Sequence, residues 1–103
     1  MVAVISDSEK FNNYLLTYYN IRMFENNSNK YGISYIGEFF SYMGRRFVIS
    51  IQVKENKTVV QIFELSGICK SCIFQKSYNT SNDKSALSKS TSTFKFIDKI
   101  LMM

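Results

Sequence analysis

The stretch that decides the fold is FVISIQV, residues 47–53. Phe47 and every second residue after it are apolar, whereas Ser50 and Gln52 fall on the other side of an extended chain. An alternation with a period of two residues is typical of a strand that buries one of its faces. The sequence therefore predicts a half-buried β-strand at these positions.

Neighbouring segments alternate in the same way, so we expect residues 33–65 to form three consecutive antiparallel strands. A two-residue turn at 44–45, with glycine in the first position, would place Phe40 opposite Ile49. The next turn lies within residues 54–57, and both registers that it allows keep the same side chains on the same face. The predicted core layer consists of Phe40, Ile49, Ile51, Val60 and Ile62.

A helix is expected before the strands. Ser6 and Asp7 are good helix-capping residues, and apolar side chains then recur at three- and four-residue steps. This pattern predicts an amphipathic helix over about residues 8–24, and the Asn-rich residues 25–30 are expected to form a polar loop. Residues 2–5 are expected to form either a short edge strand or an apolar lead-in.

The segment after the third strand is more polar. Residues 68–78 are expected to form a fourth strand, and residues 79–93, rich in Ser, Thr, Asn and Lys, a long mobile loop. Residues 94–101 fit a short helix, with a strand at 91–97 as the alternative. The predicted fold class is therefore α+β, with an N-terminal helix, an antiparallel meander of three to five strands and a short C-terminal helix, in a single domain over residues 1–103.

Composition limits the class of function. The chain has 103 residues, a formal net charge of +5 and no histidine or proline. Without histidine it lacks the usual general base at neutral pH and a common metal ligand, so we expect no enzymatic activity, no cofactor and no metal site. Most of the excess positive charge falls in the last third of the chain, which favours polyanionic or acidic partners.

No stretch is apolar over the roughly 18–20 residues that a transmembrane helix needs. The apolar residues 2–5 are too short for the core of a signal peptide, so we expect a cytoplasmic protein that does not bind membranes. The abundance of Asn, Ile and Lys matches AT-rich coding, which is frequent in viruses and mobile elements. For a viral protein the compartment would be the host cytoplasm.

The sheet face opposite the predicted core also carries apolar side chains. Tyr35 and Phe39 would form an exposed aromatic platform there if helices cover one face, and ordinary core if helices cover both. Arg45 and Arg46 are predicted at an exposed hairpin tip, where they either contact a partner or keep the turn soluble. These four residues form the predicted partner-binding set.

A nucleic-acid interface is the alternative interpretation of the basic residues. It would use Arg45 and Arg46 together with Lys84, Lys89 and Lys95, because cationic side chains contact phosphates. The lysines could equally form the solvated face of a loop and a helix.

Residues 45–53 resemble the second strand of the double-stranded-RNA-binding domain, and the order helix, three strands, helix is similar as well. The resemblance implies duplex RNA binding through the first helix, the first hairpin loop, which Arg45 and Arg46 match, and lysines that open the second helix. This sequence departs from that pattern: the loop lacks the histidine of the family, and Lys84 and Lys89 do not reproduce its paired lysines. The RNA-binding activity is therefore not carried over.

Cys69 and Cys72 form the one motif with recognised chemistry. The pair could form a disulfide or a redox couple, or be no more than two small residues near the start of a strand. A zinc site would need two more ligands, which only a dimer with two such pairs could supply as cysteine. Glu38 and Glu64 fall on the presumed core face and are expected to pair with Lys or Arg from a helix or to lie near sheet ends.

These features predict a small non-enzymatic interaction protein. It is expected to bind a protein partner, or a second copy of itself, through an aromatic and basic surface, with nucleic-acid binding as the alternative. The sequence suggests no small-molecule substrate, because it contains neither a recognisable nucleophile–base pair nor a glycine-rich phosphate loop.

Overall fold

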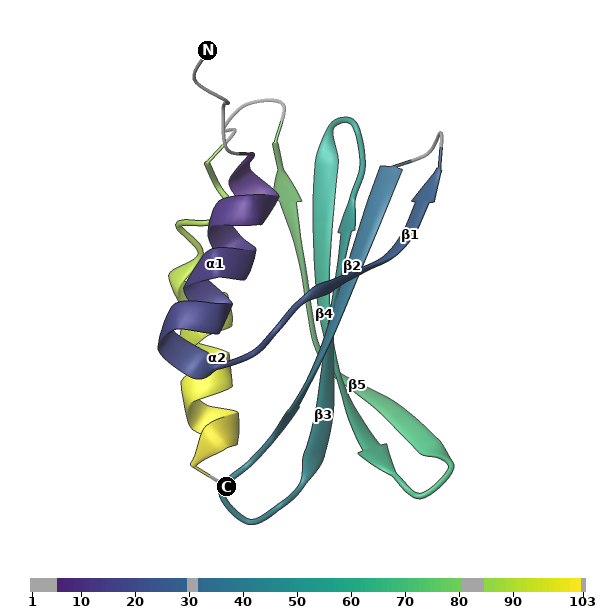
Figure 1. Ribbon diagram of the computed structural model, residues 1–103, viewed down its shortest axis with the longest axis vertical. Coiled ribbons are helices and arrows are strands. Elements are labelled where there is room, and N and C mark those ends of the chain that lie inside the picture. The colour runs from purple at the N-terminus through teal and green to yellow at the C-terminus, as the bar shows by residue number, and fades with distance from the viewer. Residues whose placement is uncertain (1–5, 30–31, 81–84, 103) are drawn as a thin grey trace.

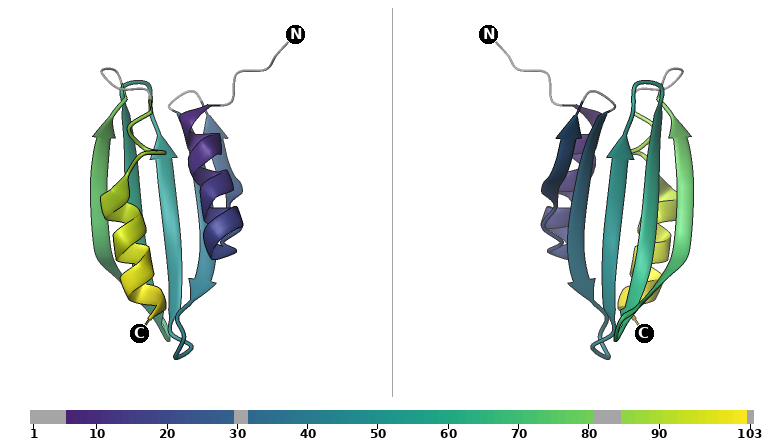
Figure 2. Two further views of the ribbon diagram at one scale, coloured as in Figure 1. Left: turned by 90° about the vertical axis from the view of Figure 1, so that its left-hand side faces the viewer. Right: turned by 90° about the vertical axis from the view of Figure 1, so that its right-hand side faces the viewer.

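The computed structural model describes residues 6–29, 32–80 and 85–102, so the expectation for residues 2–5 lies outside the described chain. The elements are α1 (Asp7–Tyr19), β1 (Phe24–Asn29), β2 (Gly32–Phe40), β3 (Arg46–Val53), β4 (Lys57–Ser66), β5 (Cys69–Asn79) and α2 (Thr91–Leu101). The five strands form one antiparallel sheet in sequence order, and both helices lie against the same face, here called the covered face (Figures 1 and 2). The predicted α+β fold is confirmed.

The first helix, α1, is shorter than predicted. Its first turn is capped by Ser6, whose hydroxyl accepts a hydrogen bond from the Glu9 backbone N–H at 3.2 Å. The helix ends at Tyr19 rather than near residue 24, because Asn20 adopts a left-handed backbone conformation with φ of 56°. The chain then crosses the covered face to reach β1 (Figure 1).

The predicted polar loop at residues 25–30 is wrong, because most of this segment forms β1. Phe24 pairs with Ile36, and a register shift follows between Glu25 and Asn27. Asparagine has a low intrinsic preference for strands. The strand is therefore explained by the edge of β2, which supplies hydrogen-bond partners that a free loop would lack.

The three strands expected within residues 33–65 are present as β2, β3 and β4, and the expected fourth strand is β5. At the β3–β4 turn Val53 pairs with Thr58, and the Lys54 N–H donates to the Lys57 carbonyl at 2.8 Å. Because β3 and β4 are in register, their apolar residues share the covered face. The fully buried members of this set are Phe47, Ile49, Ile51, Val60 and Ile62, and the last four belong to the predicted core.

The β2–β3 loop differs from the predicted two-residue turn. The Ser41 N–H donates to the Arg45 carbonyl at 2.8 Å, so three residues lie between the paired ends. Inside the loop the Gly44 N–H donates to the Ser41 carbonyl at 2.9 Å. Gly44 has φ of 85°, a conformation that glycine adopts without steric cost. A type I turn followed by such a residue is a common three-residue hairpin loop.

This loop exchanges the two faces of β2 relative to the prediction. Phe39 lies opposite Phe47 on the covered face, where the two rings stack with centroids 5.5 Å apart. Phe40 points the other way and is 57% exposed, so its predicted place in the core is wrong. The reason is that side chains alternate along a strand, and a register change by an odd number of residues reverses every one of them.

Gly37 allows the α1–β1 connection to pass close to the sheet. A Cβ atom at this position would lie 2.5 Å from the Met23 sulfur and 3.0 Å from the Arg22 carbonyl oxygen. Ile21, in the same connection, is fully buried. The connection is therefore part of the core, and a side chain at residue 37 would push it away from the sheet.

The second half of the predicted polar loop at residues 79–93 packs against the core. Leu87 is 1% exposed. The Asp7 carboxylate, at the start of α1, accepts hydrogen bonds from the backbone N–H groups of Leu87 at 2.9 Å and Ser88 at 3.1 Å. Helix α2 then begins at Thr91, so the predicted C-terminal helix is confirmed and the alternative strand is wrong.

Candidate interaction surface

The sheet face opposite the helices, here called the open face, is bare in the part of the chain that the structure describes (Figure 2). It consists of the residues of each strand that alternate with the covered ones. Its lower end, near the β2–β3 and β4–β5 turns, is mainly apolar. We define the apolar patch as Phe24, Ile36, Phe40, Val48, Phe63 and Leu65.

The members of the apolar patch differ in exposure. Phe24 and Phe40 are 60% and 57% exposed. Val48 is only 8% exposed, because it lies between Glu38 on β2 and Phe63 on β4. The patch therefore has a centre that is already packed, with two phenylalanine rings at its margin in contact with solvent.

The upper half of the open face is mainly polar, with Val59 as an apolar residue between Gln52 and Ser77. The Gln61 side-chain amide donates to the Gln75 side-chain oxygen at 3.0 Å, across β4 and β5. The neighbouring polar side chains on this half are Ser34, Ser50, Gln52 and Ser77. Uncharged polar side chains of this kind are common on solvated protein surfaces. The apolar patch thus extends from the lower end to the middle of the face, where Ile36 pairs with Ser50.

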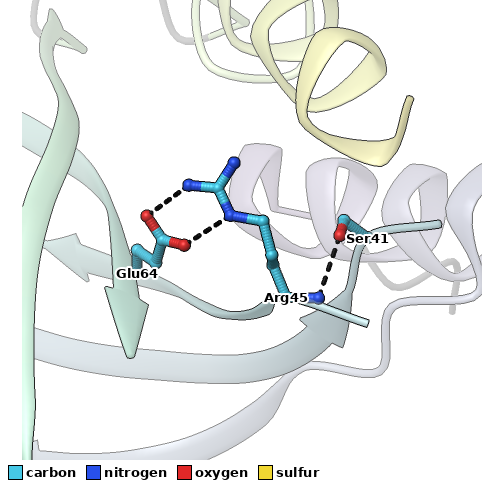
Figure 3. A network of polar contacts seen from close by, with 3 residues as sticks. All are labelled: Ser41, Arg45 and Glu64. Carbon is cyan, nitrogen blue, oxygen red and sulfur yellow. Dashed lines mark hydrogen bonds and ion pairs between the residues drawn. The ribbon is translucent and has the colours of Figure 1, made fainter. Parts of the chain in front are cut away.

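Arg45 and Arg46, predicted at a free hairpin tip, are each held by a glutamate. Arg46 donates two hydrogen bonds of 2.8 and 2.9 Å to the carboxylate of Glu38 on the open face. Arg45 donates two of 2.7 Å each to Glu64, and its backbone N–H donates to the Ser41 hydroxyl at 3.0 Å (Figure 3). Consecutive residues of an extended chain point to opposite faces, so the two guanidinium groups do not form a joint contact.

The same contacts perturb the two glutamates. Hydrogen bonds from Arg46 hold the pKa of Glu38 below its ordinary value, and hydrogen bonds from Arg45 do the same to the pKa of Glu64. Glu38 is not on the core face as predicted, because the β2 register moves it to the open face. Glu64 lies opposite Phe47, near the end of β4, where Arg45 reaches it.

The predicted aromatic platform at Tyr35 and Phe39 is wrong. Both residues lie on the covered face, where Phe39 is 5% exposed and Tyr35 is half-buried against the core. The aromatic side chains of the open face are instead Phe24, Phe40 and Phe63. The sequence feature behind this exchange of faces is Gly44. Glycine suits the third position of a three-residue loop as well as the first position of a two-residue loop.

The residues predicted for nucleic-acid binding are not gathered on one surface. Arg46 is on the open face, whereas Lys95 belongs to α2 and Lys89 leads into that helix on the covered side. Arg45 is bound to Glu64. Lys84 lies outside the described residues.

Cys69 and Cys72 are exposed, unbridged thiols in β5. Cys69 pairs with Ser66 and Cys72 with Phe63, so regular strand separates the two cysteines. Three strand steps place their Cα atoms roughly 10 Å apart, with side chains on opposite faces. A disulfide needs Cα atoms within about 7 Å, so the predicted pair does not form in this strand. The same separation prevents the two sulfurs from binding one zinc ion together.

A buried hydroxyl cluster joins α2 to β5. The Tyr78 hydroxyl bonds to Ser90 and, at 2.6 Å, to Thr93. Ser90 also caps α2, where its hydroxyl accepts from the Thr93 backbone N–H at 3.3 Å. Because every hydroxyl has a partner, the cluster has a structural role. In the described part of the chain, no three Cys, Asp or Glu side chains come together as metal ligands.

The chain matches no protein-family model, and comparisons with curated proteins and with solved structures gave no significant match. Among the described residues, no helix has the length and apolar character needed to span a membrane. The open face is therefore the feature from which a function is inferred.

Proposed function

We propose that this protein is a non-enzymatic interaction domain that docks a protein partner on the open face of its sheet. The observation that carries the proposal is the apolar patch on a face that no described helix covers. The covered face hides a comparable set of apolar side chains under two helices, whereas the patch leaves two phenylalanine rings in water. An apolar patch with exposed rings at its margin, here on either side of the Glu38–Arg46 ion pair, is typical of interaction sites.

The sheet edges are less suited to binding than the face. β1 is six residues long and contains a register shift. β5 is longer, but it carries Lys70 and Lys76 and a register shift opposite Ile62 and Phe63. Short strands, lysines and bulges are the devices that block strand addition at an edge. A partner is therefore expected to lie on the face rather than to extend the sheet.

The chemistry of the apolar patch favours a protein over a nucleic acid. The three phenylalanines of the patch could stack on bases, but Ile36, Val48 and Leu65 are aliphatic and offer no such ring. Arg46, the arginine beside them, is neutralised by Glu38. Binding to phosphates would need cations gathered on one surface.

Photo-crosslinking in the cells from which the gene comes would test the proposal. A photoreactive amino acid would replace Phe40 on the open face or, as a matched control, Tyr18 on α1, which are 57% and 68% exposed. We expect the probe at residue 40 to crosslink a discrete protein that the probe at residue 18 does not. Equal crosslinking at both positions, or a product that nuclease removes, would overturn the proposal.

A further inference from the structure

We infer that the open face binds an acidic amphipathic α-helix of its partner, laid along the strands. The inference rests on the proposed function and specifies the chemistry of the occupant. It follows from the charges at the two ends of the open face, from the distance between them, and from the blocked edges of the sheet.

The charge that remains unneutralised on the open face is positive at both ends. The charged side chains described on this face are Glu38, Arg46, Lys57 and Lys70. Glu38 and Arg46 neutralise each other. Lys70 lies over the Phe63 ring at 4.3 Å, at the lower end, and Lys57 lies at the upper end of β4, so each lysine can meet a carboxylate of a partner.

The distance between the two lysines sets the length of the occupant. Lys70 pairs with Leu65, eight residues along β4 from Lys57. At about 3.3 Å per residue the two lysines are separated by roughly 26 Å. A helix that rises 1.5 Å per residue covers this distance in about 17–18 residues. Apolar residues at three- and four-residue steps in the half of the helix nearer Lys70 would contact the apolar patch, and acidic residues near both ends would meet the lysines.

A helix on the open face would repeat the arrangement on the covered face, where α1 and α2 already pack on the same strands (Figure 1). Helices cover both faces in the layered architecture of mostly parallel sheets, and a partner helix would give this antiparallel sheet the same layers. The complex would therefore add a third layer to the two that the described residues form.

A second copy of the chain fits the open face less well. Two open faces packed by two-fold symmetry with their strands aligned have these strands either parallel or antiparallel. The first arrangement brings Lys57 to the Lys57 of the other copy, and the second brings Lys57 to Lys70. Both place like charges opposite each other, which disfavours association.

The inference is tested by selecting binders of the whole protein from a displayed library of 18-residue helical peptides. The peptides have alanine and leucine at fixed positions and random residues at the flanking positions. We expect selected peptides to carry Asp or Glu near both ends. Their affinity should fall about tenfold or more for Lys57→Glu/Lys70→Glu. It should change little for Lys95→Glu/Lys99→Glu, which alters net charge by the same amount on α2.

The other outcomes separate this inference from the proposed function. Two results would overturn the acidic helix and leave the docking face intact. One is the selection of peptides that bind the open face without acidic ends. The other is the absence of any selected peptide although a protein crosslinks at residue 40. A concentration-dependent dimer in light scattering that Phe40→Ser abolishes would overturn the acidic helix in favour of a second copy. Selected peptides with acidic ends that bind α1 or α2 instead of the open face would also overturn the inference.

Discussion

The two faces of the sheet are built from the same five strands, yet only one is covered by the helices. Phe39 and Phe40 show the contrast most directly, because the first is 5% exposed on the covered face and the second 57% exposed on the open face. Ile49 and Val48 are a second adjacent pair, and both are buried even though they face opposite ways. Both faces thus contain buried apolar side chains, and the described part of the chain covers only one of them with helices.

This difference shows how a single loop determines the interaction surface. With a two-residue loop between β2 and β3, Phe40 would lie under the helices and Tyr35 would lie in the open. The three-residue loop that ends at Gly44 reverses this choice. The open face consequently gains an exposed phenylalanine, together with the ion pair between Glu38 and Arg46.

The largest expected effect is on stability, and it compares two adjacent phenylalanines. Phe39→Ala should lower the free energy of unfolding by about 3–4 kcal/mol, because it leaves a cavity beside the stacked Phe47 ring. Phe40→Ala should change it by no more than about 0.5 kcal/mol, because that ring is largely in water. Chemical denaturation of both variants measures the difference. Equal losses of unfolding free energy in the two variants would show that Phe39 and Phe40 are buried to the same extent.

A smaller effect is expected where the covered face is joined to α2. Tyr78→Phe removes the hydroxyl that bonds to Ser90 and Thr93, while the Ser90 hydroxyl still donates to the Thr93 hydroxyl at 2.9 Å. We expect a loss of about 1–2 kcal/mol in unfolding free energy. The adjacent Ser77→Ala, on the open face, serves as the matched control and should have almost no effect. Thermal unfolding that is unchanged in Tyr78→Phe would contradict the structural role of the cluster.

The sequence predicts the strands β3 and β4 and their shared core because two strong signals agree. Ile49 and Ile51 alternate regularly with polar residues, and both registers of the next turn preserve the side-chain parity. The sequence does not predict β1, because an Asn-rich segment becomes a strand only when an edge is available to pair with it. It misplaces β2 because Gly44 suits two loop lengths that differ in parity.

The candidate surface was predictable only in part for the same reason. Val48 and Phe63 are correctly placed opposite the core by the alternation within their own strands. Phe24 and Phe40 are missed, because their faces depend on pairing partners that the local pattern does not specify. The pairing of Arg46 with Glu38 depends on the same register of β2, so the sequence alone does not show that the charge of Arg46 is neutralised.

The smallest expected effect compares the two ion pairs, one on each face, through their pH dependence. Each arginine stabilises the charged form of its glutamate, so the pKa of Glu38 and the pKa of Glu64 lie below their ordinary values in the folded protein. Lowered pKa values in the folded state mean that the stabilisation is fully present above the unfolded-state pKa. It is lost as the pH falls through the folded-state pKa.

Replacing one arginine should therefore affect one glutamate and leave the other unchanged. In Arg46→Gln we expect the pKa of Glu38 to return toward its ordinary value and the pKa of Glu64 to stay low, because Arg45 still donates two hydrogen bonds to Glu64. Carboxyl carbon shifts followed by NMR across an acid titration measure both groups in one sample. If both glutamates shifted together, the two ion pairs would have to be coupled through the sheet. The pKa of a glutamate on one face would then depend on an arginine on the other face, although the two arginine side chains point in opposite directions.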